Sequence, residues 1–396
     1  MSIDKNTVSD IGQLHDAKDL THLTHVNPDE LIAYVRQLND TSVDNAGVKI
    51  VAAIGTGGTI SMKPTSDGKL VPDLDFNKIM GFANKHLREK FLVKGFDAFA
   101  IDSSQMDYTH AKDLSICISY IWENAKIPLI GFLVLHGTDT MTYSSAAVSI
   151  MMGQGLPFSI VYTGSQKPIQ EPINDAYNNL HNALYTLESL HDNNMAEVVL
   201  VMGDLAVLGT SSEKIDDTQA NAFTAPLHKH VARFNSLEYP VKLASWLKPK
   251  RDENFEPKVW NGAFSHTLLI KSHLGLCPKM VARQVADKQV KAVVLYSYGG
   301  HTVYEPLVDA ILPVVKERNL SVFVVSPVNT EIKKIYASAH HMIENGVVPL
   351  YMTLSASLAK IEVAIRMFPD NPKAIAEFMT VNYVGEVPDL NSSYSK

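Results

Sequence analysis

The sequence predicts an α/β protein with two domains, a larger N-terminal one containing a parallel-rich sheet and a smaller C-terminal one. The 396 residues exceed what one hydrophobic core usually serves. Short apolar runs alternate with helical patterns, which is typical of parallel sheets covered by helices. A polar, proline-containing stretch at Lys248–Pro257 interrupts this alternation and indicates a connection between the domains.

The predicted strands are compact apolar runs. The first, Val48–Ile54, is rich in β-branched residues and ends in a cluster of glycines. Similar runs follow at 129–135, 159–163, 198–202, 290–296 and 321–325. Their length and continuous apolar character predict strands that are buried on both faces.

Helices are predicted between these runs from the spacing of apolar residues. The clearest pattern, Ile173–Leu190, places on one stripe the residues Ile173, Tyr177, Leu180, Leu184, Leu187 and Leu190. Segments 305–316 and 355–367 have the same apolar spacing and are also predicted to be helices. Near the N-terminus, Pro28–Leu38 is predicted to be a helix capped by Asn27.

Four segments follow from this pattern. Residues 1–46 form a polar N-terminal extension, which we expect to be flexible before its helix. Residues 47–247 form the larger domain, 248–265 the linker and 266–396 the smaller domain.

Composition excludes several classes of protein. With 35 basic and 42 acidic residues the net charge is −7, which argues against a nucleic-acid partner. Two cysteines, Cys117 and Cys277, without a CxxC or HExxH pattern, support neither a disulfide framework nor a metal site. The longest apolar run is about half a membrane span, and the N-terminus lacks the apolar core of a secretory signal. We therefore expect a cytoplasmic protein without a membrane partner.

Gly55–Thr59 is the first candidate site motif. Glycines directly after a buried strand let the backbone approach a ligand and aim its N–H groups inward. The motif is neither a Walker loop nor a full dinucleotide fingerprint, but it presents the hydroxyls of Thr56 and Thr59. The alternative is a tight turn with solvated threonines.

His136–Met141 places the hydroxyl of Thr138 beside the carboxylate of Asp139, again after a predicted strand. This carboxylate could accept a cationic group such as an α-ammonium, or orient a proton relay. Alternatively, Thr138 or Asp139 caps the next helix, and both roles are compatible. We interpret His136 as a hydrogen-bonding group rather than a catalytic one.

Two further polar loops follow apolar segments. Asp102–Met106 supplies hydroxyls that could clamp an α-carboxylate, although on its own it is an ordinary polar turn. Thr163–Pro168 follows a strand and contains Lys167. Together the four loops predict a site for a small, polar ligand resembling an amino acid.

In combination, the motifs resemble those of the bacterial-type L-asparaginases, a family of threonine amidohydrolases, and most of all its cytosolic branch. They are TGGTI at 56–60, DSSQM at 102–106, HGTDTM at 136–141, TGSQ at 163–166, SYGG at 297–300 and NGVVPLYMTLSASLAKIEVAI at 345–365. The match spans about residues 48 to 388. The resemblance implies two α/β domains, a homodimer or homotetramer with sites between subunits, and no cofactor.

The resemblance also implies residue roles. Thr59 matches the nucleophile that attacks the side-chain amide of the substrate, giving an acyl-enzyme that water hydrolyses. Asp139 matches the residue that binds the substrate ammonium, and Thr138 the second threonine. Matches to substrate-binding positions are Gly58, Asp102, Ser103, Ser104 and Gly137.

Three departures from the family pattern bear on activity. The resemblance places the family lysine six residues before Gly164, where the chain has Phe158, so we predict that Thr138 and Asp139 lack their cation. A tyrosine expected after TGGT is also missing, and similarity to mammalian relatives proposes Tyr336 in its place; alternatively Tyr336 lies on a helix face. In Leu208–Lys214, where relatives tend to have arginines, Lys214 alone is basic.

Three functions are compatible with these observations. The first is hydrolysis of L-asparagine, with L-glutamine as a secondary substrate. The second, motivated by Phe158, is a degenerate member that binds Asp or Asn as a sensor or structural oligomer. The third is an amidase subunit that feeds ammonia to a partner in tRNA-dependent amidation, which the acidic charge disfavours.

Overall fold

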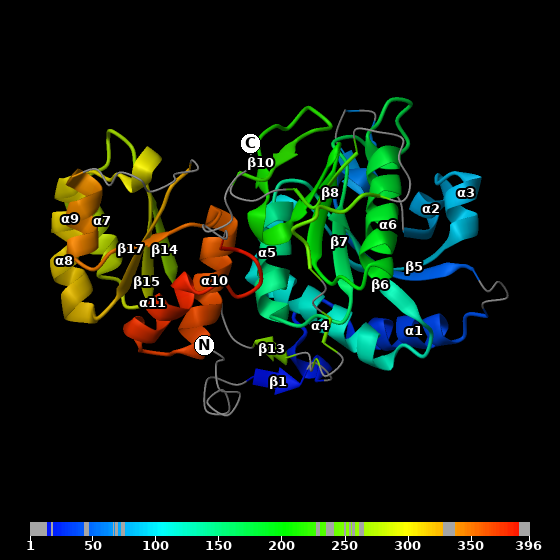
Figure 1. Cartoon of the computed structure of the whole chain (residues 1–396), viewed down its shortest axis with the longest axis horizontal. Helices are drawn as coiled ribbons and strands as arrows, with labels where there is room; N and C mark the ends of the chain where they lie inside the picture. Colours follow the sequence, from blue (N-terminus) through cyan, green and yellow to red (C-terminus); the bar gives the residue numbers. More distant parts are fainter. Residues whose placement is uncertain are drawn as a thin grey trace. The chain divides into compact units, whose positions relative to one another are not determined.

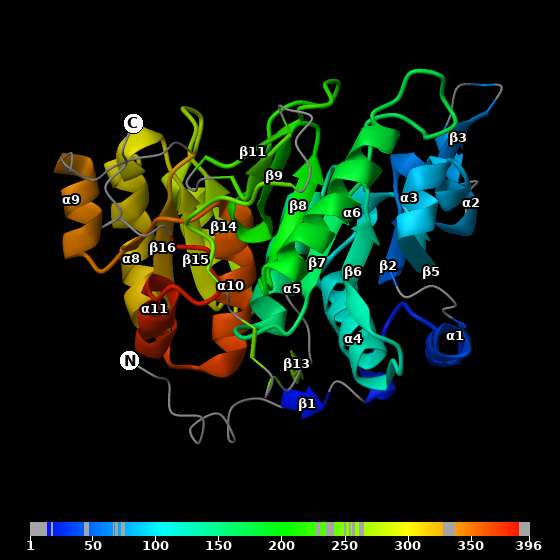
Figure 2. The ribbon, with the colours of Figure 1, turned by 45° about the vertical axis from the view of Figure 1, so that its right-hand side comes forward.

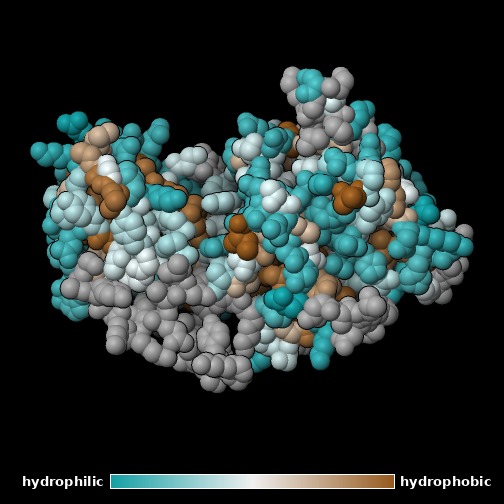
Figure 3. All heavy atoms as spheres, turned by 90° about the horizontal axis from the view of Figure 1, so that it is seen from above, coloured by the Kyte–Doolittle hydropathy of each residue, from teal (hydrophilic) through white to brown (hydrophobic). Residues whose placement is uncertain are grey.

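The computed structural model describes residues 14–16, 19–42, 47–65, 67, 70–72, 76–226, 230–234, 241–248, 251–252, 255, 258–260, 265–327 and 337–387. The chain divides into two compact units, one mainly of residues 15–259 and one mainly of residues 260–396. Most of the linker predicted at 248–265 lies outside the described residues. None of the described helices has the length and apolarity that a membrane crossing requires. The face in Figure 3 is mainly hydrophilic, with apolar residues in small separate groups.

A seven-stranded sheet forms the centre of the larger unit (Figure 1). Its parallel strands are β2 (Lys49–Gly57), β5 (Phe91–Ile101), β6 (Leu129–Leu135), β7 (Ser159–Thr163) and β8 (Val198–Met202). The antiparallel strands β9 (Leu205–Leu208) and β12 (Ala232–Arg233) complete the order β12-β9-β8-β7-β6-β2-β5. The bounds predicted for β6, β7 and β8 are confirmed.

Helices cover both faces of this sheet, because successive residues of a strand point to opposite sides. Leu133 packs in one cluster with Leu184 of α6 (Ala176–Asp192). Its neighbour Phe132 faces the other way, where Phe158 lies between it and Trp122 of α4 (Tyr108–Asn124). The remaining helices of the sheet region are α2 (Phe76–Gly81), α3 (Lys85–Lys90) and the almost wholly buried α5 (Met141–Met152).

The helix predicted from Ile173 begins three residues later than expected. Asn174 accepts a hydrogen bond from the backbone N–H of Ala176 (3.0 Å) and so ends the preceding turn. Ile173 is therefore 81% exposed and Tyr177 42% exposed, outside the buried stripe that starts at Leu180.

The described part of the N-terminal extension belongs almost wholly to the larger unit, which begins at His15. It contains β1 (Leu14–Asp16), a 3₁₀ turn at Leu20–His22 and α1 (Pro28–Asn39), whose cap by Asn27 is confirmed. α1 lies beside α4 in both ribbon views (Figure 1 and Figure 2). The buried Asp113 of α4 accepts hydrogen bonds from the backbone N–H groups of Thr24 (2.9 Å) and His25 (2.6 Å). The expected flexibility is therefore wrong for these residues.

The smaller unit has a parallel sheet of its own, in the order β14 (Thr267–Lys271), β15 (Ala292–Tyr296), β16 (Ser321–Val325), β17 (Val348–Leu350). Its helices are α7 (Pro278–Val285), α8 (Glu305–Arg318), α9 (Ala337–Glu344), α10 (Leu354–Met367) and α11 (Pro372–Thr380). Lys360 on α10 and Glu386 form a fully buried ion pair (2.5 Å). The predicted α/β class is confirmed for both units.

Short strand pairs complete the structure. They are β1 with β13 (Lys258–Trp260), β3 (Met62–Pro64) with β4 (Leu70–Pro72), and β10 (Glu213–Lys214) with β11 (Phe223–Thr224).

Candidate active site

The site motifs lie at one edge of the large sheet. β2, β5, β6 and β7 are parallel neighbours, so the loops after them emerge at their carboxyl ends, where open α/β sheets bind ligands. A 3₁₀ turn at Thr59–Ser61 follows β2, and another at Ser103–Gln105 follows β5. The Thr138–Asp139 pair follows β6, and the TGSQ motif follows β7.

Glycines allow three of these loops to approach one another closely. A Cβ atom on Gly58 would lie 2.6 Å from the Cα and N atoms of Gly137. A Cβ on Gly137 would in turn lie 2.5 Å from the Oγ atom of Ser103. Gly58 also has a φ of 89°, which disfavours other residues. The glycines therefore set the spacing between the Thr59, Ser103 and Thr138 loops.

The two threonines of the first motif differ in environment. Thr56 is buried, and its hydroxyl donates a hydrogen bond to the carbonyl of Leu135 (3.1 Å), so it ties β2 to β6. Thr59 follows Gly58 and is half-buried at the start of its 3₁₀ turn. Of the two, Thr59 therefore has the hydroxyl that is available to a ligand.

The Asp102 loop is organised by its own carboxylate. Asp102 caps the 3₁₀ turn by accepting a hydrogen bond from the backbone N–H of Ser104 (2.9 Å). Ser103 is buried against Gly137, and its carbonyl accepts a hydrogen bond from the hydroxyl of Thr140 (2.8 Å). Ser104 is exposed, so the two serines present hydroxyls at different depths.

Thr138 and Asp139 do have a cation, which corrects the prediction made from Phe158. The ammonium of Lys214, on β10, donates hydrogen bonds to Thr138 Oγ1 (3.1 Å) and to Asp139 Oδ1 (2.7 Å). Phe158 instead fills the core between Trp122 and Phe132. The side chain at position 158 therefore belongs to the hydrophobic core between the sheet and α4.

Two opposing effects set the pKa of Lys214. Its side chain is only 15% exposed, and burial by itself lowers its pKa. The hydrogen bonds and charges of Asp139 and Asp217, whose Oδ1 lies 2.5 Å away, outweigh burial and raise the pKa above its ordinary value. Lys214 is therefore an ammonium at neutral pH, with Asp139 57% exposed beside it.

Gln166 links the TGSQ loop to the loop that carries Lys214. Its side-chain oxygen accepts a hydrogen bond from Thr138 Oγ1 (3.5 Å). Its amide nitrogen donates to the carbonyls of Asp216 and Gln219 (both 3.4 Å). Its backbone N–H donates to the carboxylate of Asp175 (3.0 Å). Gln166 thus orders Thr138 relative to Lys214, a role that the sequence motif alone does not indicate.

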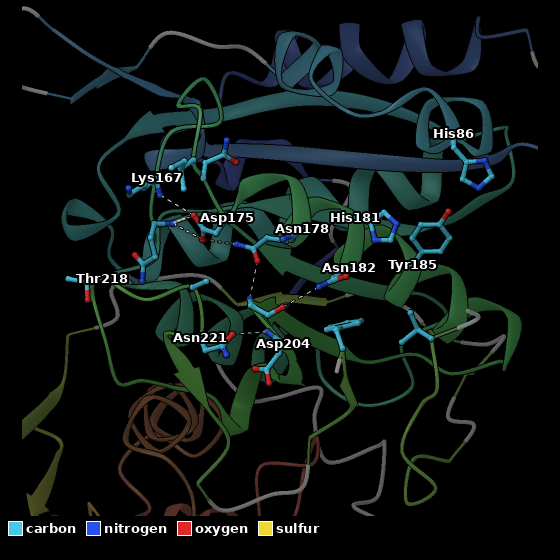
Figure 4. A pocket seen from close by; sticks show the side chains of 18 residues that line it. His86, Lys167, Asp175, Asn178, His181, Asn182, Tyr185, Asp204, Thr218 and Asn221 are labelled. Carbon is cyan, nitrogen blue, oxygen red and sulfur yellow. Dashed lines mark hydrogen bonds between the residues drawn. The ribbon is translucent and has the colours of Figure 1, made fainter. Parts of the chain in front are cut away.

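A cavity of about 940 Å³, lined by both polar and apolar side chains, adjoins this loop (Figure 4). Lys167 and Asp175 lie at one end of the view, and His86, His181 and Tyr185 at the other. Gln166 also lines the cavity. Lys167 thus lines this cavity, whereas the lysine that contacts Thr138 is Lys214.

Of the two remaining predicted residues, the structure describes His136. His136 is fully buried and its Nδ1 donates to the carbonyl of Gly137 (2.7 Å), in agreement with a structural role. Tyr336 lies outside the described residues, so its assignment stays a prediction.

The chain is similar to a known protein family and to individual proteins and solved structures. The profile of the family described as "Asparaginase, N-terminal" matches residues 50–245. A subunit of the glutamyl-tRNA(Gln) amidotransferase of Aeropyrum pernix is 27% identical over 348 residues, covering 81% of this chain and 78% of that protein. The L-asparaginase of Thermococcus kodakarensis is 26% identical over 341 residues, covering 84% and 98%.

Solved structures agree in fold. The thermostable L-asparaginase from Thermococcus kodakarensis has a TM-score of 0.72 at 24% identity, with 86% of this chain and 99% of that chain covered. L-asparaginase I from Vibrio cholerae has a TM-score of 0.71 at 24% identity, with the same coverage. At this identity the likeness establishes the fold.

Proposed function

The chain belongs to the asparaginase family of amidohydrolases, and on that premise we propose that it hydrolyses L-asparagine to L-aspartate and ammonia. The observation that carries the proposal is the hydrogen-bonded group of Thr138, Asp139 and Lys214 at the sheet edge where Thr59 also lies. A hydroxyl, a carboxylate and an ammonium in contact can hold and move a proton during acyl transfer.

In the proposed reaction Thr59 is the nucleophile. Its Oγ attacks the side-chain amide carbon and gives up its proton, while the amide nitrogen takes up a proton and leaves as ammonia. Backbone N–H groups of the glycine loop can stabilise the oxyanion. Water then cleaves the β-aspartyl ester, releases L-aspartate and returns a proton to Thr59.

Asp139 has two tasks in this scheme. It pairs with Lys214 in the free protein, and it accepts the substrate α-ammonium through its exposed side. The incoming ammonium competes for the carboxylate and weakens its hold on the Lys214 proton. Substrate binding thereby makes Lys214 a better proton carrier at Thr138. Ser103 and Ser104 are proposed to bind the α-carboxylate.

The two alternative functions, a degenerate binder and an ammonia-supplying subunit, differ in their support. The hypothesis of a degenerate binder rested on the absence of a cation at Thr138 and Asp139. Lys214 is a cation in contact with both residues, so this reason for the hypothesis no longer holds. The ammonia-supplying subunit is favoured by the similarity to the Aeropyrum pernix amidotransferase. It predicts little ammonia release by the isolated chain and a preference for glutamine, whereas our proposal predicts release from asparagine without a partner. Homo-oligomerisation and a cytoplasmic location stay predictions.

The test is ammonia release by the purified chain with asparagine, glutamine or buffer. We expect asparagine turnover that Thr59→Ala abolishes, because the nucleophile is lost, and that Thr59→Ser partly retains. Thr56→Ala should be milder, since Thr56 ties two strands together. Full turnover by Thr59→Ala would reject the nucleophile, and no turnover by the wild type with either amide would reject the activity.

A further inference from the structure

Two histidines from distant parts of the chain stack where the N-terminal extension meets α4. The rings of His25 and His110 are 3.8 Å apart between centroids and inclined by only 6°. His110 Nδ1 lies 2.8 Å from Asp107 Oδ1. His25 Nε2 lies 2.8 Å from Thr109 Oγ1, which itself donates to Asp107 Oδ1 (2.5 Å). His110 thus turns a ring nitrogen toward the Asp107 carboxylate, and His25 turns one toward the hydroxyl that donates to the same carboxylate.

Three metal-ligating atoms converge here. Within the part of the chain that the structure describes, one atom each from His25, Asp107 and His110 lies within 4.8 Å of the other two. We propose that these three residues bind one divalent transition-metal ion of the Zn²⁺ class. The site lies apart from Thr59 and Lys214 in the sequence, and it does not rest on the proposed activity.

The donor set suits such an ion. Imidazole nitrogens and a carboxylate oxygen are the ligands that Zn²⁺ takes, at about 2.0–2.1 Å, with water in the fourth position. His25 is exposed and can adjust its ring to complete the coordination.

The backbone around the site is already fixed. The N–H of His25 is bonded to buried Asp113, and buried Lys112 donates to the carbonyl of His22 (2.6 Å). Asp107 is the N-cap of α4, which fixes its position. A metal ion would need to draw together side chains whose main chains are in place, which reduces the entropy cost of binding.

The consequence is a cross-link between the extension and the start of α4. Asp107 follows the Ser103–Gln105 turn by two residues. An ion at the site would therefore fasten the extension beside the loop that carries both serines, and would stabilise the folded chain through metal linkage.

The test is calorimetric titration of the full chain with Zn²⁺ after treatment with a chelator. We expect one ion per chain, with affinity reduced more than about tenfold in His25→Gln and in Asp107→Asn. Both variants keep local hydrogen bonding, and asparagine retains the N-cap. His340→Ala, which removes an exposed histidine of α9, serves as the matched control.

Two further readouts keep the proposal testable if a variant folds poorly. Zn²⁺ should raise the unfolding temperature of the wild type and of His340→Ala, but not that of His25→Gln. Co²⁺ should give a ligand-field absorption band with the wild type that His25→Gln lacks. Equal Zn²⁺ affinity in the wild type and His25→Gln, binding lost in His340→Ala instead, or no binding at all would each overturn the proposal. Ammonia release is not used as a readout, so failure here leaves the enzymatic proposal standing.

Discussion

Lys214 reaches Thr138 and Asp139 from a two-residue strand about 75 residues further along the chain. Removing its ammonium in Lys214→Met should lower kcat for asparagine by about 10²–10⁴-fold, which is the usual contribution of a positioned proton carrier. Steady-state kinetics with Lys167→Met as the control checks this, because Lys167 lines the adjoining cavity. A Lys214→Met enzyme as fast as the wild type would show that the relay is not used.

His136 makes stability depend on pH. Its full burial lowers its pKa to about 4, despite the hydrogen bond to Gly137, against an ordinary value of 6.5. As the pH falls, the unfolded chain therefore binds a proton at His136 before the folded chain does. The stability that neutral His136 contributes is complete above about pH 6.5 and is lost as the pH falls toward 4. The loss between about pH 7.5 and about pH 5 should be roughly 2 kcal/mol.

Urea unfolding at both pH values checks this prediction. His136→Asn retains a donor for Gly137 but cannot titrate, so its loss of stability should be smaller by that amount. Identical losses in the two proteins would assign the pH dependence to other histidines, among them His181 and His191, whose pKa values burial also lowers.

At the scale of single residues, the sequence indicates the hydroxyls and carboxylates of the site but not its cation. Thr59, Ser103 and Thr138 each follow an apolar run closely, so their position at a strand end can be read from hydropathy. Lys214 follows the short β9 and a 3₁₀ turn at Gly209–Ser211, which have no such signature. Its isolation as the basic residue of Leu208–Lys214 is the available clue, whereas the family spacing points to Phe158 instead.

The contact between Gly58 and Gly137 governs the loop elements. In Gly58→Ala the new methyl would overlap the backbone of Gly137, and the positive φ of 89° adds strain. We expect a loss of about 1–3 kcal/mol in stability and a larger relative loss of kcat, because Thr59 is displaced. Gly81→Ala is a matched control, since a Cβ there meets nothing within 4 Å. Comparable kinetics in both variants would contradict the prediction that the contact between Gly58 and Gly137 positions Thr59.

Central strands were predictable and edge strands were not. β6, β7 and β8 are buried along their whole length and read as continuous apolar runs. β5 is at the sheet edge and alternates between buried and exposed residues, with Lys94 and Asp97 breaking the run. β14, an edge strand of the smaller sheet, has a short apolar run of three residues between Thr267 and Lys271, so the sequence does not predict it.

For the whole molecule, two compact units predict two separable unfolding steps. Lys360 and Glu386 are both fully buried, so Glu386→Ala would leave a lysine without its carboxylate and should destabilise the smaller unit by about 3–5 kcal/mol. Glu377→Ala is the control, because its pair with Lys373 is exposed (4.0 Å) and worth about 1 kcal/mol at most. Scanning calorimetry should show one transition move in Glu386→Ala and neither in the control. A single transition that shifts as a whole would show that the units unfold together.

The docking of the N-terminal extension also has a consequence for synthesis on the ribosome. Thr24 and His25 are translated first, yet their hydrogen-bond partner Asp113 follows 88 to 89 residues later. At roughly 5–20 residues per second, about 4 to 18 s pass before that carboxylate is made. During this interval Leu20 and Leu23 also wait for Ile116, against which they pack. The segment around Thr24 and His25 must thus wait for a later helix, and a nascent chain halted before α4 holds this segment without its docking partner.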